Sequence, residues 1–310
     1  MGLKQTAVNL AGIKMKNPVM TASGTFGYGL EYADLIDLDK LGAIVTKTIT
    51  PEPRCGNQQP RIFELPYGLI NTIGLQNVGL ERLLSEKLPA LRKITRTPVI
   101  ASIGGYTTAD YVKSVKGLAG SGVAGIELNI SCPNVKTGYK LKKTNYLTIS
   151  QNPGKTYRLV REVKKNTRLP LIVKLSPNVT DITEIAASAE KAGADALCLI
   201  NTFPAMAYAG SGKDKYSVPI FGGLSGPCIK PLALRMVHQV CRTVKIPVVA
   251  MGGIMNGEDA RDFLQAGAVA VAVGTGNFVD PGIIIDIINA LQDTDGLPPR
   301  HKDTKKKGIS

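Results

Sequence analysis

The sequence is poor in the residues that most metal and disulfide sites use. It holds two histidines, five cysteines and no tryptophan among 310 residues. The cysteines are odd in number, widely spaced and never arranged as Cys-x-x-Cys, which argues against a disulfide framework, a zinc site and a bound iron–sulfur cluster. The two histidines, His238 and His301, disfavour a multi-histidine metal centre and a Ser-His-Asp triad. We therefore expect no metal site, and acid–base chemistry that uses another side chain.

Long hydrophobic runs are also missing. No stretch of about 18 apolar residues occurs, and the first residues lack the apolar segment and cleavage site of a secretory signal. A content of 44% hydrophobic and 20% charged residues is typical of a globular chain and excludes a disordered or fibrous one. We therefore predict a cytoplasmic globular protein.

Acidic residues are scarce beside basic ones, 24 against 38, which gives a formal net charge of +14. Residues 136–168 hold ten Lys/Arg against one acid, and residues 300–310 hold five against one. The rest of the chain is close to neutral. The second segment follows Pro298-Pro299 and has no apolar periodicity, so we predict one domain over residues 1–297 and a basic, disordered tail over 298–310. The first segment either attracts an anionic substrate, docks an acidic partner, or is simply a solvated helix face.

Short apolar or β-branched runs alternate with segments of helical spacing. The eight runs are residues 18–23, 43–48, 98–103, 125–131, 171–176, 196–202, 248–252 and 270–275. Helical spacing occurs between them at 108–119, 156–165, 182–192, 231–243 and 257–266. This pattern predicts an α/β fold of the (β/α)8 TIM-barrel type rather than a doubly wound sheet, which usually opens with a Gly-x-Gly-x-x-Gly turn that is absent here. The long connections 51–81 and 203–231 would emerge at the C-terminal face, where active sites form, as lids or binding loops.

Polar and small residues end these predicted strands. They are Ser23, Lys47, Thr48, Ser102, Asn129, Lys174, Asn201, Thr202, Gly252, Gly253, Gly274 and Thr275. Glycines at the ends of the last two strands let the backbone approach a ligand, and barrels often bind phosphate there, although tight turns alone would also use glycine. With the glycine-rich loop 222–226 beside them, they favour a cofactor that carries phosphate.

Two lysines stand out among the strand ends. Lys174 belongs to an otherwise apolar strand, and Lys47 lies between two threonines. An ammonium group at a barrel mouth needs an anionic or acceptor partner unless its side chain extends to water. Together the two lysines predict that an anion, or a cofactor that becomes anionic, binds between them.

Cys132 follows a predicted strand and precedes Pro133, which prevents an immediate helix. An isolated cysteine is usually a small buried hydrophobe. Here Asn129, Ser131 and Asn134 make the surroundings polar, which favours a reactive thiol. A thiol with a reference pKa of about 8.5 can serve as a general base where histidine is scarce.

These residues resemble a known family, the catalytic subunits of class 1B dihydroorotate dehydrogenases. The resemblance spans about residues 7–290 and rests on five motifs: Asn129-Ile-Ser-Cys-Pro-Asn-Val-Lys136, Asn71-Thr-Ile-Gly-Leu-Gln-Asn77, Lys174-Leu-Ser-Pro-Asn-Val-Thr-Asp181, Gly222-Gly-Leu-Ser-Gly-Pro227 and Met251-Gly-Gly253. Val135-Lys136 and Arg54-Cys-Gly-Asn57 are similar to class 1B rather than to the fumarate-using class 1A. The resemblance implies oxidation of dihydroorotate to orotate in pyrimidine biosynthesis.

The resemblance also implies roles for individual residues. Cys132 would remove the C5 proton while C6 gives hydride to N5 of one FMN per chain, and Lys174 would stabilise negative charge on the flavin. The implied FMN site is Ser23, Lys47, Thr48, Ser102, Asn129, Lys174, Ile200, Gly226, Gly252, Gly253, Gly274 and Thr275. The implied dihydroorotate site is Lys47, Asn71, Thr72, Ile73, Gly74, Leu75, Asn129, Asn201 and Thr202.

A separate subunit is implied as well, because no motif for FAD or a 2Fe-2S cluster occurs in this chain. That iron–sulfur flavoprotein would pass electrons to NAD, with a homodimer of this chain at the core of a heterotetramer. Two features depart from the family: Ser102 replaces a common asparagine, and the segment after Lys136 lacks the usual Gly-Gly and Phe-Gly pattern.

Two other functions fit parts of the sequence. A tRNA dihydrouridine synthase is also a flavin barrel with a cysteine beside a proline, and the basic segment would suit RNA. It normally carries a further RNA-binding domain, and only a short tail follows residue 290. A barrel that binds RNA without catalysis is a third possibility, disfavoured by the joint presence of Cys132, Lys47 and Lys174.

Overall fold

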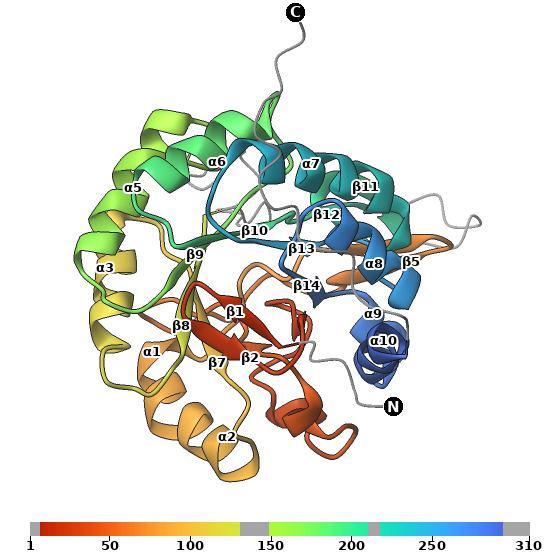
Figure 1. Cartoon of the computed structure of the whole chain (residues 1–310), viewed down its shortest axis with the longest axis horizontal. Coiled ribbons are helices and arrows are strands. Elements are labelled where there is room, and N and C mark those ends of the chain that lie inside the picture. Colours follow the sequence, from red (N-terminus) through yellow and green to blue (C-terminus); the bar gives the residue numbers. More distant parts are fainter. Residues whose placement is uncertain (1–6, 131–148, 210–217, 294–310) are drawn as a thin grey trace, which may run out of the picture.

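Eight parallel strands form a closed barrel in the computed structural model, which describes residues 7–130, 149–209 and 218–293 (Figure 1). In barrel order they are β3 (Val19–Thr21), β14 (Ala270–Val273), β13 (Val248–Met251), β10 (Ala196–Leu199), β9 (Leu171–Lys174), β8 (Gly125–Asn129), β7 (Val99–Ile103) and β4 (Ile44–Val45). A parallel bridge between Met20 and Ala43 joins the first and last of these strands. The predicted TIM barrel is confirmed, with each strand inside its predicted run.

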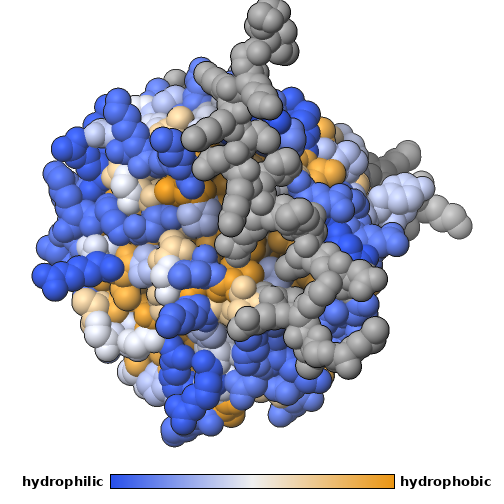
Figure 2. Space-filling model, viewed as in Figure 1, coloured by the Kyte–Doolittle hydropathy of each residue, from blue (hydrophilic) through white to orange (hydrophobic). Residues whose placement is uncertain are grey.

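Helices surround the barrel and bury one face each. They are α1 (Gly79–Arg82), α2 (Leu88–Ile94), α3 (Thr108–Gly117), α5 (Pro153–Lys165), α6 (Ile182–Lys191), α7 (Lys230–Thr243), α8 (Gly257–Gln265), α9 (Gly276–Val279) and α10 (Ile283–Gln292), with short turns η1 (Leu30–Tyr32), η2 (Leu38–Lys40), η3 (Leu83–Lys87) and η4 (Pro227–Ile229). In α5, Thr156, Leu159, Val160 and Val163 are buried at the spacing of one helix face. Outward-facing side chains are mostly hydrophilic, as the rim of the molecule shows (Figure 2).

A hairpin closes the N-terminal end of the barrel. It consists of β1 (Val8–Leu10) and β2 (Ile13–Met15), paired antiparallel. Leu10, Ile13 and Met15 pack in one cluster with interior barrel residues such as Ile100 and Ile172. Because this apolar cluster fills the N-terminal half of the barrel, ligands can enter only from the C-terminal end.

The two long connections form a second sheet, which the sequence did not predict. Its strands are β11 (Phe203–Ala209), β12 (Val218–Ser225), β6 (Gly68–Asn71) and β5 (Ile62–Leu65), all antiparallel. Gly223 pairs with Asn71, and a Cβ atom at Gly223 would lie 2.0 Å from Thr202 Oγ1. Glycine at this position therefore lets the sheet lie directly against the C-terminal end of the barrel.

Within the described residues, no helix is both long and apolar enough to cross a membrane. The predicted tail, residues 298–310, and the first part of the basic segment lie outside the described residues. The boundary between domain and tail therefore stays a prediction.

Candidate active site

A cavity of about 920 Å³ lies between the C-terminal end of the barrel and the second sheet. Its size is within the range of sites that bind small molecules and cofactors. Most of the residues expected at the site line it: Ser23, Lys47, Thr48, Asn71, Ile73, Gly74, Leu75, Asn129, Lys174, Ile200, Asn201, Thr202, Gly226, Gly252, Gly253, Gly274 and Thr275. Thr72 and Ser102 do not border the cavity, and Cys132 lies outside the described residues.

Glycine is required at one end of this cavity. Gly226, Gly252 and Gly253 have φ values of 101°, 126° and 79°, which L-residues with a Cβ rarely adopt. A Cβ at Gly252 would lie 2.8 Å from Ala233 Cβ, and one at Gly253 would lie 2.8 Å from Lys230 Cβ. The backbone here is thus shaped by close packing behind it, and it presents no side chain that would keep a ligand away.

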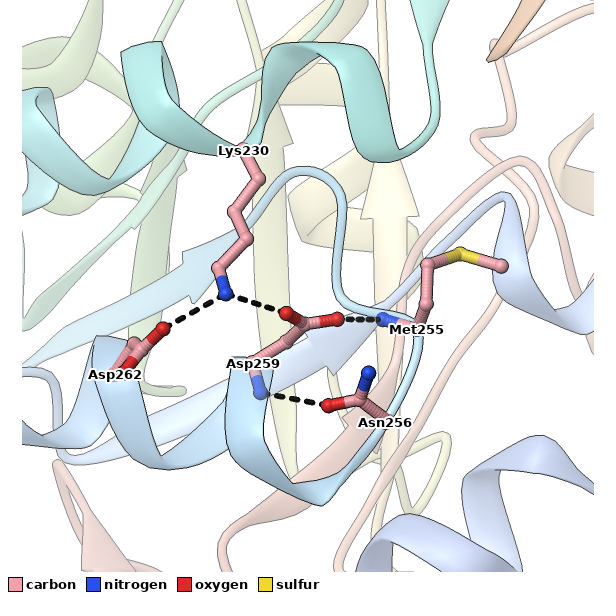
Figure 3. Close-up of polar contacts among 5 residues, drawn as sticks. All are labelled: Lys230, Met255, Asn256, Asp259 and Asp262. Carbon is pink, nitrogen blue, oxygen red and sulfur yellow. Dashed lines mark hydrogen bonds and ion pairs between the residues drawn. The ribbon is translucent and has the colours of Figure 1, made fainter. Parts of the chain in front are cut away.

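Charged side chains hold this glycine segment in place (Figure 3). Lys230, at the start of α7, forms ion pairs with Asp259 and Asp262 on α8, the latter at 2.7 Å. Asp259 Oδ2 also accepts a hydrogen bond from the backbone N–H of Met255 at 2.8 Å. Asn256 Oδ1 accepts one from the backbone N–H of Asp259 at 2.9 Å. The loop that contains Gly252 and Gly253 is therefore fixed to two helices.

The two lysines lie on the same cavity in different surroundings. Lys174 is 4% exposed, and its Nζ donates to Ser23 Oγ at 3.1 Å. Burial lowers the pKa of Lys47, partly offset by the carboxylate of Glu31. Lys174 is thus held by Ser23 at the C-terminal end of the barrel, which forms the floor of the cavity, and Lys47 loses its proton more readily than an exposed lysine.

The loop 71–77 is anchored from outside the cavity. Asn57 Nδ2 donates to the carbonyl oxygen and hydroxyl of Thr72, at 2.8 and 2.9 Å. Asn77 Nδ2 donates to the carbonyl oxygen of Leu75, whose φ of 57° is unusual for a leucine. Thr72 does not face the cavity because its side chain holds the loop to Asn57, while its neighbours Asn71 and Ile73 do face it.

A buried hydroxyl in the cavity wall lacks a partner. Thr202 Oγ1 has no hydrogen bond to any of the described residues, although it is fully shielded. The backbone of Thr202 is held on both sides, since its N–H donates to Asn201 Oδ1 and its carbonyl oxygen accepts from Asn178 Nδ2. The hydroxyl lies against Gly223 of β12, where a Cβ atom would be 2.0 Å from Oγ1, so glycine at that position makes room for it.

Some cavity residues were not found from the sequence. Tyr28, Glu31, Arg54, Met255 and Phe278 line the cavity but lie in loops and short helices beyond the strand ends. Only one of them, Arg54, belongs to a motif noted in the sequence, Arg54-Cys-Gly-Asn57. Conversely, Ser102 was expected at a strand end, but it lies inside β7, one residue before its end. Its side chain is fully buried below the cavity and is hydrogen-bonded to Thr48 and Glu127.

Comparison with known proteins gives a consistent result. A family model described as dihydroorotate dehydrogenase matches residues 5–294. A dihydroorotate dehydrogenase B (NAD(+)) catalytic subunit of Citrifermentans bemidjiense is 52% identical over 276 residues, covering 89% of this chain and 88% of that protein. The same subunit of Geotalea uraniireducens is 50% identical over 293 residues, covering 94% and 93%. A crystal structure of the dihydroorotate dehydrogenase of Eimeria tenella with ferulenol has a TM-score of 0.77 at 24% identity, covers 93% of this chain and 83% of that one, and supports the fold.

Proposed function

This chain belongs to the dihydroorotate dehydrogenase family, and we propose that it is the catalytic subunit of an NAD-linked enzyme of that family. It oxidises dihydroorotate to orotate in pyrimidine biosynthesis. The family match and the relatives favour this function over the two RNA-related alternatives.

The cavity fits a flavin that carries phosphate. The family is flavin dependent, and we propose FMN, one per chain. Three observations support it: the glycine backbone at Gly226, Gly252 and Gly253, the buried Lys174 on the barrel floor, and a volume large enough for both a cofactor and a small substrate. The residues proposed to hold FMN are Ser23, Lys47, Thr48, Asn129, Lys174, Ile200, Gly226, Gly252, Gly253, Gly274 and Thr275.

When bound, FMN supplies the hydride acceptor for C6 of dihydroorotate. Lys174 would supply positive charge beside the flavin and so stabilise negative charge on it, which is how a protein tunes a flavin. The hydroxyl of Ser23 holds the Lys174 ammonium group in place. Because the surrounding barrel is closed at its other end by the β1–β2 hairpin, these groups act in a site shielded from water on that side.

The substrate would be held between the loop 71–77 and the barrel floor. Lys47 would pair with its carboxylate, and Thr202 would border the pyrimidine ring. Asn71, Ile73, Gly74, Leu75, Asn129 and Asn201 complete the proposed substrate site. Cys132 is proposed as the base that removes the C5 proton.

Electrons must leave the chain after each turnover. The relatives are named as catalytic subunits of an NAD(+) enzyme, which implies a partner subunit. We propose an iron–sulfur flavoprotein that carries FAD and a 2Fe-2S cluster, a heterotetramer built on a homodimer of this chain, and a cytoplasmic location.

The observation that carries the proposal is that Lys47, Lys174, Asn129 and the glycine segments line one cavity. The test is to reconstitute the purified protein with FMN and add dihydroorotate without oxygen. Bleaching of the visible flavin band is expected. A protein that binds FMN but is not bleached would contradict dihydroorotate as the substrate, and a protein that binds no FMN would contradict the flavin site.

A further inference from the structure

Four polar side chains form a continuous hydrogen-bonded series beneath the cavity. Asn129 Nδ2 lies 3.0 Å from Thr48 Oγ1, Thr48 Oγ1 lies 2.8 Å from Ser102 Oγ, and Ser102 Oγ lies 2.7 Å from Glu127 Oε1. Glu127 is 2% exposed and Ser102 is fully buried. The series runs from a residue that lines the cavity to a carboxylate in the barrel interior, and the function proposed above assigns no role to that carboxylate.

The direction of donation along the series is fixed by its buried end. A hydroxyl has one hydrogen to donate. Ser102 donates it to Glu127, so Ser102 must accept from Thr48. Thr48 then has no hydrogen left for Asn129 and accepts one from Asn129 Nδ2. The carboxylate therefore determines which end of the Asn129 amide faces Thr48.

The other carboxylate oxygen of Glu127, Oε2, also accepts a hydrogen bond. Cys198 Sγ lies 3.4 Å from Glu127 Oε2. Burial, reinforced by the charge of Glu127, raises the pKa of the Cys198 thiol well above its usual value, while Lys174 acts weakly the other way. The thiol thus stays protonated and donates, so both oxygens of Glu127 accept hydrogen bonds.

The backbone of Asn129 is fixed independently of this series. The hydroxyl of Tyr111, a fully buried side chain of α3, donates to the carbonyl oxygen of Asn129 at 3.1 Å. Asn129 also pairs with Lys174 across strands β8 and β9. With the backbone held, the orientation of the Asn129 side-chain amide decides whether its donor or its acceptor end faces Thr48.

We propose that Glu127 is a positioning residue, which acts through Ser102 and Thr48 to fix the donor and acceptor pattern that Asn129 presents to the pyrimidine ring. This inference rests on the function proposed above.

The test compares three variants with the wild type. Ser102→Ala breaks the series in its middle, Glu127→Gln removes its fixed end, and Ser114→Ala is the matched control. Ser114 is also fully buried, but it lies on α3 and its hydroxyl has no partner among the described residues. Ser102→Ala keeps the test valid if Glu127→Gln does not fold.

The first measurement is the Kd of orotate for the FMN-loaded protein, which is determined from the change in the flavin spectrum on binding. Ser102→Ala and Glu127→Gln should each raise the orotate Kd by about fivefold to tenfold, the usual effect of one hydrogen bond. The double variant should be no weaker than either single variant, because both break one series. Ser114→Ala should leave the orotate Kd within about twofold of the wild type, which would show that the loss of a buried hydroxyl does not by itself weaken orotate binding.

The second measurement is the rate of hydrogen exchange at the Asn129 side-chain amide, which NMR detects in the ligand-free protein. Exchange should become about tenfold faster in Ser102→Ala and Glu127→Gln and stay unchanged in Ser114→Ala. This measurement needs no substrate, so it tests the series even if dihydroorotate fails to bleach the wild-type flavin. Unchanged exchange, or independent effects of the two substitutions on orotate binding, would overturn the proposal.

Discussion

Lys174 Nζ lies 3.1 Å from Ser23 Oγ and so connects strand β9 to the end of strand β3 across the barrel mouth. Both side chains line the cavity, and Lys174 is almost fully buried. A buried ammonium group whose hydrogen-bond partner among the described residues is a neutral hydroxyl is costly unless an anionic group shares the site. We therefore propose that the pair stabilises negative charge during the reaction.

Replacement of Lys174 should impair flavin reduction more than substrate binding. In Lys174→Met we expect the rate of flavin reduction by dihydroorotate to fall by about 10²–10³-fold, the usual effect of losing a group that stabilises developing charge. Anaerobic rapid mixing measures this rate directly. Lys245→Met, which changes an exposed lysine, is the control. A Lys174→Met rate within a few-fold of the control would argue against this role.

Cys132 can be tested against a cysteine that is chemically inert. Cys132→Ala should retain FMN and lose about 10²–10⁴-fold in the rate of flavin reduction, the usual contribution of a general base. Cys241→Ala should leave the rate unchanged, because burial raises the pKa of the Cys241 thiol to about 12 and keeps it protonated. Near-normal reduction in Cys132→Ala would remove Cys132 from the mechanism.

The same assignment predicts how the wild-type rate depends on pH. Reduction should become faster as the pH rises toward the pKa of a thiol, about 8.5 in model compounds. The rate of flavin bleaching at saturating dihydroorotate, measured from pH about 6 to about 9, reports this dependence. A flat profile would be evidence against a thiol base.

Orotate binding should show the opposite dependence on pH. Burial lowers the pKa of Lys47, so its positive charge is lost at a lower pH than in an exposed lysine, whose pKa is about 10.4. The orotate Kd should therefore rise in the alkaline range. In Lys47→Arg this rise should be absent, because arginine stays charged throughout. The same alkaline rise in both proteins would show that another group is responsible.

Lys230 gives a prediction for the cofactor end of the cavity. Lys230→Met leaves Asp259 and Asp262 without their shared cation and loosens the loop that holds Gly252 and Gly253. We expect the FMN Kd to rise by about tenfold, as the loss of a partly buried ion pair and its hydrogen bonds would give. Fluorescence titration of the apoprotein with FMN measures it. Lys155→Met, an exposed lysine on α5, should bind FMN normally.

The barrel and most of the cavity lining could be predicted because they depend on local pattern. Apolar runs of five to seven residues set the strands, and the C-terminal ends of parallel strands necessarily meet at one face. The second sheet could not be predicted, since Asn71 and Gly223 pair across 152 residues and neither connection contains a signal for the other. Thr72 and Ser102 show a second limit: the chain position places a residue at the site, but packing decides which way its side chain points.

The pairing of β6 with β12 also sets the order in which the protein becomes functional during synthesis. The loop 71–77 leaves the ribosome early, yet its strand pairs with residues 223–225, which are made after most of the barrel. A nascent chain therefore contains the loop 71–77 of its proposed substrate site before β12, the strand that pairs with β6, has been made. Translation must pass Ser225 before the site can assemble, so a chain truncated before that point would expose β6 as an unpaired edge, a known starting point for aggregation.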